Sequence, residues 1–496
     1  MITGKTLLSH GWAAGKLLGI ALALAQAPDL ATMNETEILE LLDRVRNQPG
    51  QYLTDQRLEP LARACLQAQG VTASIESDSL RDAPLDFPIW GQNGIQAEAI
   101  DQMRMAMRLP ITVAGGLMAD AHFGYGLPIG GVLGTRGAVV PYAVGLDIGC
   151  RVRLSLYPVS PIVLDAQPRR FREALMTQTH FGLGKAEWAG ERPEHPIIDD
   201  ARWQPTALLR GLRQTAIGQL GSSGTGNHFV EWGRVTVTDG MGLSVEPGVY
   251  LGLLSHSGSR RIGSEVASRY TKIAQEQHSY LAPEAQKLAW LDLGTEAGQE
   301  YWISMTLAGD FAAANHAIIH ERVSRAAGLS PVAMVENFHN FAWMETGEDG
   351  APIIVHRKGA TPAHLGTLGV IPGTSAHDGY LVRGRGNAAS LNSASHGAGR
   401  AMSRKAATAA ISQEARADFL AQRGVTMLGG GCDEAPQAYK DPAAVMAAQA
   451  DLVEDAEAGE GFNQQTDRKA EHGGATVEAF GLPELLLVDL SDRGGL

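Results

Sequence analysis

Short apolar runs alternate with glycine loops from about residue 86 onward, and this alternation constrains the fold of the chain most. The runs at 151–159 and 248–256 have the length and apolar content of β-strands. Longer stretches at 264–278 and 301–323 predict helices between such runs. The 59 glycines of this 496-residue chain gather in the loops. We therefore expect a mixed α/β (α+β) core whose functional residues lie on loops.

The region before residue 86 differs because its pattern favours helices. Apolar residues recur every three to four positions in 34–47, and Asn34 followed by Glu37 predicts a capping box at the start of that helix. A further helix is expected at 57–70. The polar, proline-containing stretch 76–88 predicts a linker.

The apolar run at 15–26 has two interpretations. It could be a signal peptide, because a lysine precedes it and small residues follow it. The run is short, however, and His10 and Trp12 come before it, which favours an ordinary helix. We therefore divide the chain into a helical N-terminal extension, 1–85, and one large domain, 86–496.

Net charge and cysteine content limit the cellular setting. The net charge of −13 argues against a general nucleic-acid coat protein, although a local basic groove stays possible. The three cysteines, Cys65, Cys150 and Cys432, predict a reducing compartment without a disulfide framework, and hence a cytoplasmic protein. Apolar runs stay well short of the roughly 20 residues of a membrane span, so no membrane partner is expected.

Several glycine-flanked motifs carry residues that bind metals. In GLDIGC, Asp147 and Cys150 are close enough to converge on one divalent ion, and the soft sulfur would suit Mn, Co, Zn or Fe. The pair could equally be a buried cysteine beside a turn-forming aspartate. His228, His256 and His339 lie in similar glycine-flanked or buried settings, and each could be a ligand or a structural histidine.

Other motifs favour phosphate. Arg260 in HSGSR, and Arg357 with Lys358 before a glycine turn, could grip an anion or simply be solvated. In SASHGAGRAMSR, His396 is surrounded by residues too small to cover it, with arginines behind. Its imidazole could be a nucleophile, a general base or a metal ligand. Together the motifs predict metal-assisted phosphoryl or nucleotidyl transfer.

The content and order of eight strings resemble the RtcB-type RNA ligases, the family that includes the tRNA-splicing ligase. The strings are DAHFGYGLPIGG, YAVGLDIGC, GTGNHFVE, HSGSR, HNFA, HRKGAT, SHGAGRAMSR and DEAPQAYKD. They follow the family order from about residue 90 to 445. Each string is moderately specific, whereas the ordered set is highly specific. The resemblance implies one RtcB-like catalytic domain over 86–496 with a central metal and nucleotide cleft.

The resemblance also implies roles for individual residues. His396 matches the histidine that attacks the α-phosphate of GTP and carries GMP. Arg260 and Arg404 match basic residues expected to meet RNA phosphates. The implied ligands for one or two Mn²⁺ ions are Asp147, Cys150, His228, His256 and His339. The implied guanylate contacts are Asn227, Glu231, His339, Asn340, Pro372, Gly373, Thr374, Ser375, His396, Gly397, Ala398, Gly399 and Tyr439.

The reaction implied by the resemblance is GTP- and Mn²⁺-dependent joining of RNA ends. A 3′-phosphate or 2′,3′-cyclic phosphate end would be joined to a 5′-hydroxyl end, with or without an activating protein. Two departures concern the nucleotide: Gly379 stands where many members carry serine, and the sequence ends in LLLVDLSDRGGL without the usual lysine. They keep open a metal-dependent RNA end phosphatase or cyclic phosphodiesterase, and a non-catalytic RNA-binding factor.

Overall fold

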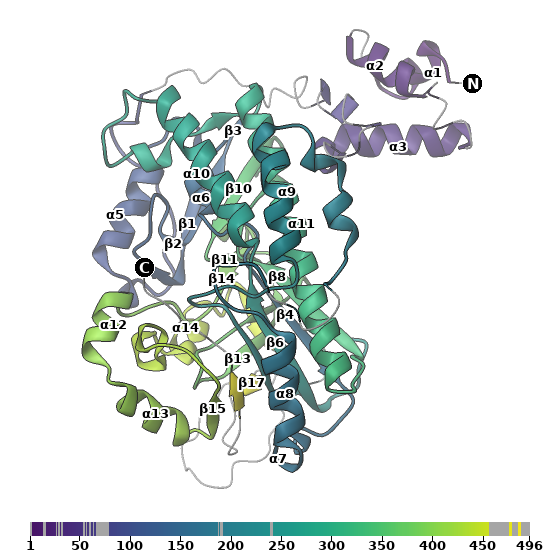
Figure 1. Ribbon diagram of the computed structural model, residues 1–496. Helices are drawn as coiled ribbons and strands as arrows, with labels where there is room; N and C mark the ends of the chain where they lie inside the picture. The colour runs from purple at the N-terminus through teal and green to yellow at the C-terminus, as the bar shows by residue number, and fades with distance from the viewer. Residues whose placement is uncertain are drawn as a thin grey trace.

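The computed structural model of the chain describes residues 79–455 apart from 187, 189–191 and 239–241, together with most of 2–65 and two short strands near the C-terminus. Figure 1 shows the described helices around a core of sheets. These helices are α1 Gly4–Ser9, α2 Lys16–Ala25, α3 Glu35–Asn47, α5 Ala97–Ala106, α6 Pro141–Val144, α7 Val163–Ala166, α8 Pro168–Gln178, α9 Ala207–Gln219, α10 Arg260–Gln277, α11 Glu296–Ala326, α12 Arg404–Ala410, α13 Gln413–Ala421 and α14 Pro442–Ala447.

The described strands form a large sheet, a four-stranded sheet and two small two-stranded sheets. Their pairing is antiparallel except for β15 with β18. This arrangement confirms the mixed α+β class. The strands are β1 Thr112–His122, β2 Ile129–Thr135, β3 Ala138–Val139, β4 Arg151–Tyr157, β5 Phe229–Val237, β6 Gly248–Ser257, β7 Leu291–Asp292, β8 Ala333–Phe338, β9 Asn340–Thr346, β10 Pro352–Lys358, β11 Ala360–Pro362, β12 Leu368–Ile371, β13 Gly379–Gly384, β14 Ser393–Ser395, β15 Val425–Met427, β16 Val453–Asp455, β17 Thr476–Glu478 and β18 Leu485–Leu487.

The elements predicted in the large domain are present. The strands expected at 151–159 and 248–256 are β4 and β6. The helices expected at 264–278 and 301–323 are α10 and α11, and both begin earlier than predicted. For α11 the earlier start has a local cause: the Thr295 side chain caps the helix by accepting the N–H of Gly298.

The large sheet has one face on helices and one face on a cavity, because side chains alternate along each strand. On β5, Val230 and Trp232 pack against Phe171 of α8 and Ile319 of α11. The alternate residues of the same strand, with Glu231 among them, line the cavity. The alternation therefore places Glu231 on the cavity side of the strand, together with the apolar Phe229 and Val235.

The four-stranded sheet, in the order β1-β2-β10-β9, meets the large sheet at the point where the chain passes from one sheet into the other. Strand β8 of the large sheet is followed by β9 of the four-stranded sheet, and a single residue, His339, connects them. Backbone hydrogen bonds close the crossing: His339 N–H donates to Cys150 O at 3.0 Å, and Gly149 N–H donates to Asn340 O at 2.8 Å. The crossing fixes residues 149–150 beside residues 339–340 although almost 200 positions separate them.

The N-terminal helices have an apolar cluster of their own. Leu7, Trp12, Leu42 and Val45 are buried within it, and Figure 1 shows α1, α2 and α3 at one end of the molecule. The capping box is confirmed, since the Asn34 side chain accepts the N–H of the third helical residue and receives the reciprocal bond. Helix α2 confirms the helix expected at 15–26.

Two predictions about the N-terminal region stay predictions. The helix expected at 57–70 and the linker expected at 76–88 fall partly outside the described residues, which omit 66–78. The domain boundary at residue 85 lies beside that gap. Leu58 and Leu61 are buried in the N-terminal cluster, so at least the start of 57–70 packs with α1 to α3.

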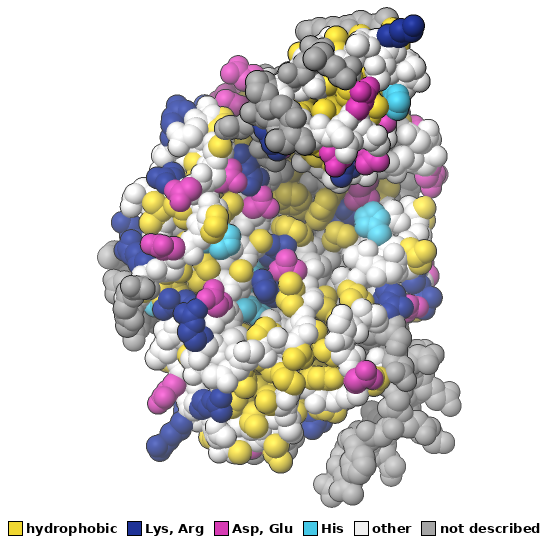
Figure 2. Space-filling model, turned by 90° about the vertical axis from the view of Figure 1, so that its right-hand side faces the viewer, with side chains coloured by type: hydrophobic (Ala, Val, Ile, Leu, Met, Phe, Trp, Pro, Cys, Tyr) yellow, Lys and Arg dark blue, Asp and Glu magenta, His cyan; other side chains and the backbone are white. Residues whose placement is uncertain are grey.

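The surface carries mixed charge. Figure 2 shows Lys and Arg side chains interspersed with Asp and Glu side chains on one face, with hydrophobic side chains gathered over its lower half. The net negative charge of the chain is therefore not concentrated on this face. Across the part of the chain that the structure describes, every helix is too short or too polar to cross a lipid bilayer.

Candidate active site

A cavity of about 1070 Å³ lies where the two sheets meet. It brings together residues from almost every motif that the sequence analysis selected. Only Arg260 of the predicted site residues is absent from its lining. The predicted residues that line it are Asp147, Cys150, Asn227, His228, Glu231, His256, His339, Asn340, Pro372, Gly373, Thr374, Ser375, His396, Gly397, Ala398, Gly399, Arg404 and Tyr439.

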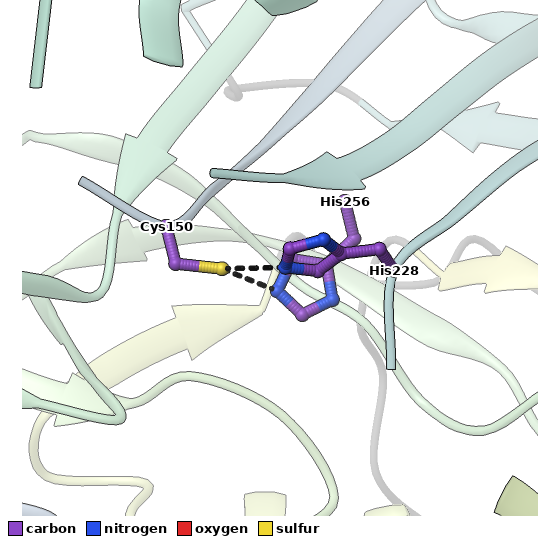
Figure 3. A group of neighbouring side chains, drawn as sticks. All are labelled: Cys150, His228 and His256. Carbon is purple, nitrogen blue, oxygen red and sulfur yellow. Dashed lines mark hydrogen bonds between the residues drawn. The ribbon is translucent and has the colours of Figure 1, made fainter. Parts of the chain in front are cut away.

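One thiol and two imidazoles, all buried, form a compact donor cluster (Figure 3) and line the cavity. The Sγ of Cys150 lies 3.1 Å from Nε2 of His256 and 3.5 Å from Nε2 of His228. The three donor atoms lie within 4.8 Å of one another. His339 extends the cluster, with its Nε2 3.0 Å from Nε2 of His256. This donor set suits a borderline or soft divalent metal ion.

A backbone hydrogen bond fixes the orientation of the His228 ring. Its Nδ1–H donates to the carbonyl oxygen of Ser223 at 2.8 Å, which leaves Nε2 turned to the cavity. That Nε2 lies 2.8 Å from a carboxylate oxygen of Asp147. Two atoms with lone pairs approach so closely only with a positive species between them, either a proton or a metal ion. The geometry of Asp147 and His228 therefore fits a cation.

A glycine makes room for the Asp147 carboxylate. A Cβ placed on Gly258, in the HSGSR motif, would lie only 2.1 Å from Oδ1 of Asp147. Any larger residue would displace the carboxylate from the cluster. The small residue of this motif is thus required by close packing at the site.

Burial controls the charge of the cluster. It lowers the pKa of His256 to about 3 and that of His339 well below its usual value, so both imidazoles are neutral and able to bind a metal. Burial, together with the Asp147 carboxylate, raises the pKa of the Cys150 thiol. A bound divalent cation would reverse the effect on Cys150, because it stabilises the thiolate.

A buried atom without a partner also points to a ligand. Nδ1 of His339 is buried and has no hydrogen-bond partner in the structure. Buried polar atoms are rarely left unsatisfied. The cluster of Cys150, His228, His256 and His339, with Asp147 at its edge, therefore fits a metal site by donor type, by the neutral imidazoles of His256 and His339, and by unfilled bonding capacity.

His396 has different partners from the other histidines of the cavity. Its Nδ1–H donates to Oδ2 of Asp120 at 2.6 Å, and the backbone N–H groups of His396 and Gly397 approach the same oxygen at 3.2 and 3.3 Å. The His396 ring lies 4.9 Å from the His339 ring, centroid to centroid. With Nδ1 engaged, Nε2 carries the free lone pair, and the side chain is 16% exposed at the cavity. This arrangement suits a nucleophile or base.

Asp120 is the main functional residue that the sequence analysis did not select. It is fully buried on β1. Burial alone would raise its pKa, but the electrostatic interaction with His396 and the hydrogen bond from its ring outweigh that effect and lower the pKa of Asp120. The sequence offered one signal: Asp120 is the only carboxylate in the apolar stretch TVAGGLMADAH. It is also the first residue of the family string DAHFGYGLPIGG. Its partner His396 could not be identified from that signal.

The glycine turn after His396 rests directly on Asp120. Gly399 has a φ of 71°, and a Cβ there would lie 2.0 Å from the carbonyl oxygen of Asp120. Only glycine combines that backbone conformation with that approach. The small residues around His396 therefore let its loop contact the strand that holds the histidine.

Two arginines behind this loop are tied to acidic residues. Arg400 donates to Glu434 at 2.7 Å and to the Tyr439 hydroxyl at 3.2 Å. Arg404 forms an ion pair with Glu434 at 2.7 Å, and its side chain is half exposed at the cavity. Arg404 thus keeps part of its donor capacity for an anion.

The other two predicted phosphate-binding arginines lie elsewhere. Arg260 is buried in a left-handed backbone conformation, with φ of 59°, and its Nε donates to Ser222 Oγ at 3.0 Å. It packs behind His228 and its contact with RNA stays a prediction. Arg357 is fully buried and pairs with Glu345 at 2.6 Å, which makes it a structural ion pair.

Two further cavity residues carry unusual charge states. Lys358 donates to the carbonyl oxygens of Tyr125 and Tyr142, and burial with the nearby Lys287 lowers its pKa to about 7. Glu231 lines the cavity, and burial raises its pKa to about 8. Such shifts are typical of functional cavities.

The two departures noted in the sequence differ in outcome. Gly379 lines the cavity, and a Cβ there would meet the Ile371 oxygen and the Pro372 Cα at 3.2 Å. Local packing therefore favours glycine at this position. The C-terminal stretch beyond Leu487 lies outside the described residues, and its effect on guanine binding stays a prediction.

Comparisons with known proteins identify several relatives of this chain. The chain is 32% identical over 387 residues to the RNA-splicing ligase RtcB of Escherichia coli K12, covering 73% of this chain and 92% of that protein. It is 32% identical over 388 residues to the RNA-splicing ligase RtcB of Mycobacterium tuberculosis H37Rv, covering 65% and 89%. With the tRNA-splicing ligase RtcB of Thermococcus kodakarensis it shares 30% identity over 390 residues, covering 65% and 81%.

A family model points the same way and confirms the resemblance seen in the motifs. The model described as tRNA-splicing ligase RtcB matches residues 102–458, which include every cavity residue discussed above. This chain belongs to the RtcB family.

Proposed function

We propose that this protein is an RNA ligase that uses GTP and Mn²⁺ to join RNA 3′-phosphate or 2′,3′-cyclic phosphate ends to 5′-hydroxyl ends. We also infer that residues 86–496 form the catalytic domain and that the protein works in the cytoplasm. The observation that carries the proposal is one cavity in which a histidine held by a buried carboxylate adjoins a cluster of metal-binding side chains. Membership of the RtcB family supports RNA as the substrate.

The first step is nucleophilic attack by His396. Its Nε2 lone pair would attack the α-phosphorus of GTP, a nitrogen–phosphorus bond would form, and pyrophosphate would leave. Asp120 keeps the proton on Nδ1 and fixes the ring, so that the reacting nitrogen is always the one facing the cavity. This is the role of the buried carboxylate in other histidine-carboxylate pairs.

The metal would be held beside that reaction. Cys150, His228 and His256 are the ligands that geometry supports best, with Asp147 and His339 able to complete one or two sites. A bound divalent ion offsets negative charge on phosphate oxygens as a nucleophile approaches. The family resemblance leads us to expect manganese. The donor set by itself would also suit Zn or Co.

The guanylate would lie along the loops that line the cavity. Asn227, Asn340, Glu231 and Tyr439 offer amide, carboxyl and phenol groups toward it. The loops at 372–375 and 397–399 bring little side-chain bulk to the cavity. The buried Ser375 hydroxyl has no partner in the structure and is free for such a contact.

Two further transfers complete the proposal. An oxygen of the RNA 3′-phosphate attacks the phosphorus on His396, and the imidazole leaves; a cyclic end is first opened by water. The 5′-hydroxyl oxygen then attacks the 3′-phosphate phosphorus, a phosphodiester forms, and GMP leaves. Arg404 supports charge neutralisation on the RNA side of the cavity, and Arg260 is assigned the same role by family resemblance alone.

The test is a joining assay with end-labelled RNA. Strands carrying 3′-phosphate, 2′,3′-cyclic phosphate or 3′-hydroxyl ends are mixed with 5′-hydroxyl strands, GTP and Mn²⁺. We expect joined product from the first two and none from the third. Opened or dephosphorylated ends without joined product would instead support the end-processing alternative, and binding without any chemistry would support the non-catalytic one.

A further inference from the structure

Two large aromatic side chains stand exposed at the cavity. Phe123 is 55% exposed and Tyr125 is 61% exposed, and both line the cavity next to the His396 loop. They lie in the loop that follows β1. Exposed aromatic rings that line one concave site mark a surface that is covered in the functional state. The inference drawn from them rests on the proposed function and deepens it.

The backbone that carries these rings is anchored. The side-chain amide of Gln102, on α5, donates to Gly124 O at 2.6 Å and accepts from Gly124 N–H at 3.0 Å. Lys358 Nζ donates to the carbonyl oxygen of Tyr125. The loop therefore does not fold back to bury its rings. A rigid, exposed aromatic pair loses little conformational freedom when a ligand covers it.

One cation lies against the Tyr125 ring, and two more line the same cavity. Lys287 Nζ lies 4.5 Å from the centroid of the Tyr125 ring. Arg404 and Lys405 line the same cavity with exposed side chains. Aromatic rings interleaved with basic groups are the usual surface for single-stranded nucleic acid, because bases stack on the rings while cations meet the backbone. A protein partner would not need this combination.

The platform lies close to the reacting group. Phe123 follows Asp120 by three residues, so their Cα atoms are at most about 10 Å apart on an extended chain. Asp120 holds His396 directly. A base stacked on Phe123 would thus belong to a nucleotide at or next to the RNA end that reacts.

We propose that Phe123 and Tyr125 form a stacking platform for the unpaired bases at the RNA ends. The ligand chemistry is the π-face of a nucleobase, and its source is the terminal nucleotide of the 3′-phosphate strand or of the 5′-hydroxyl strand. Stacking would be tolerant of base identity, since every base presents a π-face. It would hold the end in place without reading its sequence.

The experiment measures RNA binding by the full-length protein without GTP, so that no chemistry occurs. Each strand is prepared with an ordinary terminal nucleotide and with an abasic one. We expect wild type to bind at least one abasic strand about tenfold more weakly than its normal counterpart. Phe123→Ala and Tyr125→Ala should weaken binding of the normal strand similarly and leave binding of the abasic strand unchanged. The affected strand identifies the source.

Matched variants control for loss of structure. Phe123→Leu keeps apolar bulk without an aromatic ring and should behave like Phe123→Ala, whereas Tyr125→Phe should bind like wild type. Tyr280→Ala removes a tyrosine that is similarly exposed, 54%, but lies outside the cavity lining, and should bind like wild type. Thermal melting verifies that each variant is folded.

Three results would overturn the inference: equal binding of normal and abasic strands by wild type, equal weakening of both strands in the alanine variants, or no RNA binding. The proposed function fails separately. If the wild-type protein joins RNA ends but binds normal and abasic strands equally, only the stacking platform is refuted. If it binds normal strands more tightly than abasic ones but never joins ends, only the ligase function is refuted.

Discussion

Two histidine environments share the cavity, and they differ although the His339 and His396 rings are only 4.9 Å apart. His256 and His339 lie among a thiol and other imidazoles, deeply buried, and their pKa values are lowered by burial. His396 instead faces a buried carboxylate that engages one ring nitrogen. The same residue type is thus prepared for metal binding in one place and for nucleophilic attack in the other, and the partners decide which.

The largest expected effect separates these environments by removing the nucleophile. His396→Ala should lower formation of the GMP–protein adduct by at least about a thousandfold, since it removes the nitrogen that would attack. Metal affinity should stay at the wild-type value, because His396 is outside the thiol–imidazole cluster. Intact-mass analysis with GTP and Mn²⁺ measures the first and elemental analysis the second. An undiminished adduct would refute the assignment.

A second change tests the carboxylate that distinguishes His396. Asp120→Asn keeps the size of the side chain but removes its charge, so the preferred position of the imidazole proton is lost. We expect the rate of adduct formation to fall by about a thousandfold, somewhat less than the roughly ten-thousandfold loss when the aspartate of a Ser-His-Asp triad becomes asparagine. Metal affinity should again be unchanged. If adduct formation proceeded at the wild-type rate, Asp120 would have only a packing role.

Removal of a metal-binding imidazole should have the complementary result. His256→Ala is expected to lower Co²⁺ and Mn²⁺ affinity by at least about a hundredfold. Loss of a residue that only hydrogen-bonds to a ligand already costs up to about a hundredfold, and loss of the ligand itself should cost more. Cobalt spectroscopy follows this directly: Cys150→Ser should abolish the sulfur-to-cobalt absorption while His396→Ala retains it. Wild-type metal binding by His256→Ala would show that the metal site lies elsewhere.

The smallest effect concerns the support behind His228. Ser257 Oγ donates at 2.6 Å to the same carbonyl of Ser223 that accepts Nδ1–H of His228. Ser257→Ala should therefore loosen the imidazole and lower metal affinity by about tenfold. The matched change Ser264→Ala, on the exposed face of α10, should leave it unaltered. Equal effects of the two substitutions would argue against the role of Ser257.

Local elements of this molecule were predictable, but contacts between distant segments were not. Apolar spacing placed α3, α10, α11, β4 and β6, and the capping box at Asn34 followed from residues three apart. Such features depend on neighbours in sequence. Helix starts were missed by four or five residues because they depend on caps and packing.

The site shows the same limit more sharply. The candidate ligands were selected from their motifs and from the resemblance to the RtcB-type ligases, and the cavity contains them. The partnership of Asp120 with His396 joins residues 276 positions apart, and no spacing rule connects them. Arg260 illustrates the reverse: its motif suggested phosphate, but in the folded chain its guanidinium contacts Ser222 behind the cavity. Assignment of a charged residue to a ligand requires knowledge of what else it meets.

Lys358 provides the strongest internal rival to His396 as the group that becomes guanylylated. It lines the same cavity, and its pKa is lowered to about 7, so a good part of it is the neutral amine at physiological pH. A lysine in that state is a competent nucleophile. The two possible adducts can be distinguished after digestion, because His396 and Lys358 lie on different peptides.

The most direct measurement is therefore to map the adduct. Wild-type protein is incubated with GTP and Mn²⁺, digested, and the guanylylated peptide is identified by tandem mass spectrometry, with His396→Ala and Lys358→Ala alongside. Our account predicts GMP on the peptide containing His396, its loss in His396→Ala and its retention on His396 in Lys358→Ala. GMP on Lys358, or no adduct in metal-loaded and folded wild type, would contradict the account.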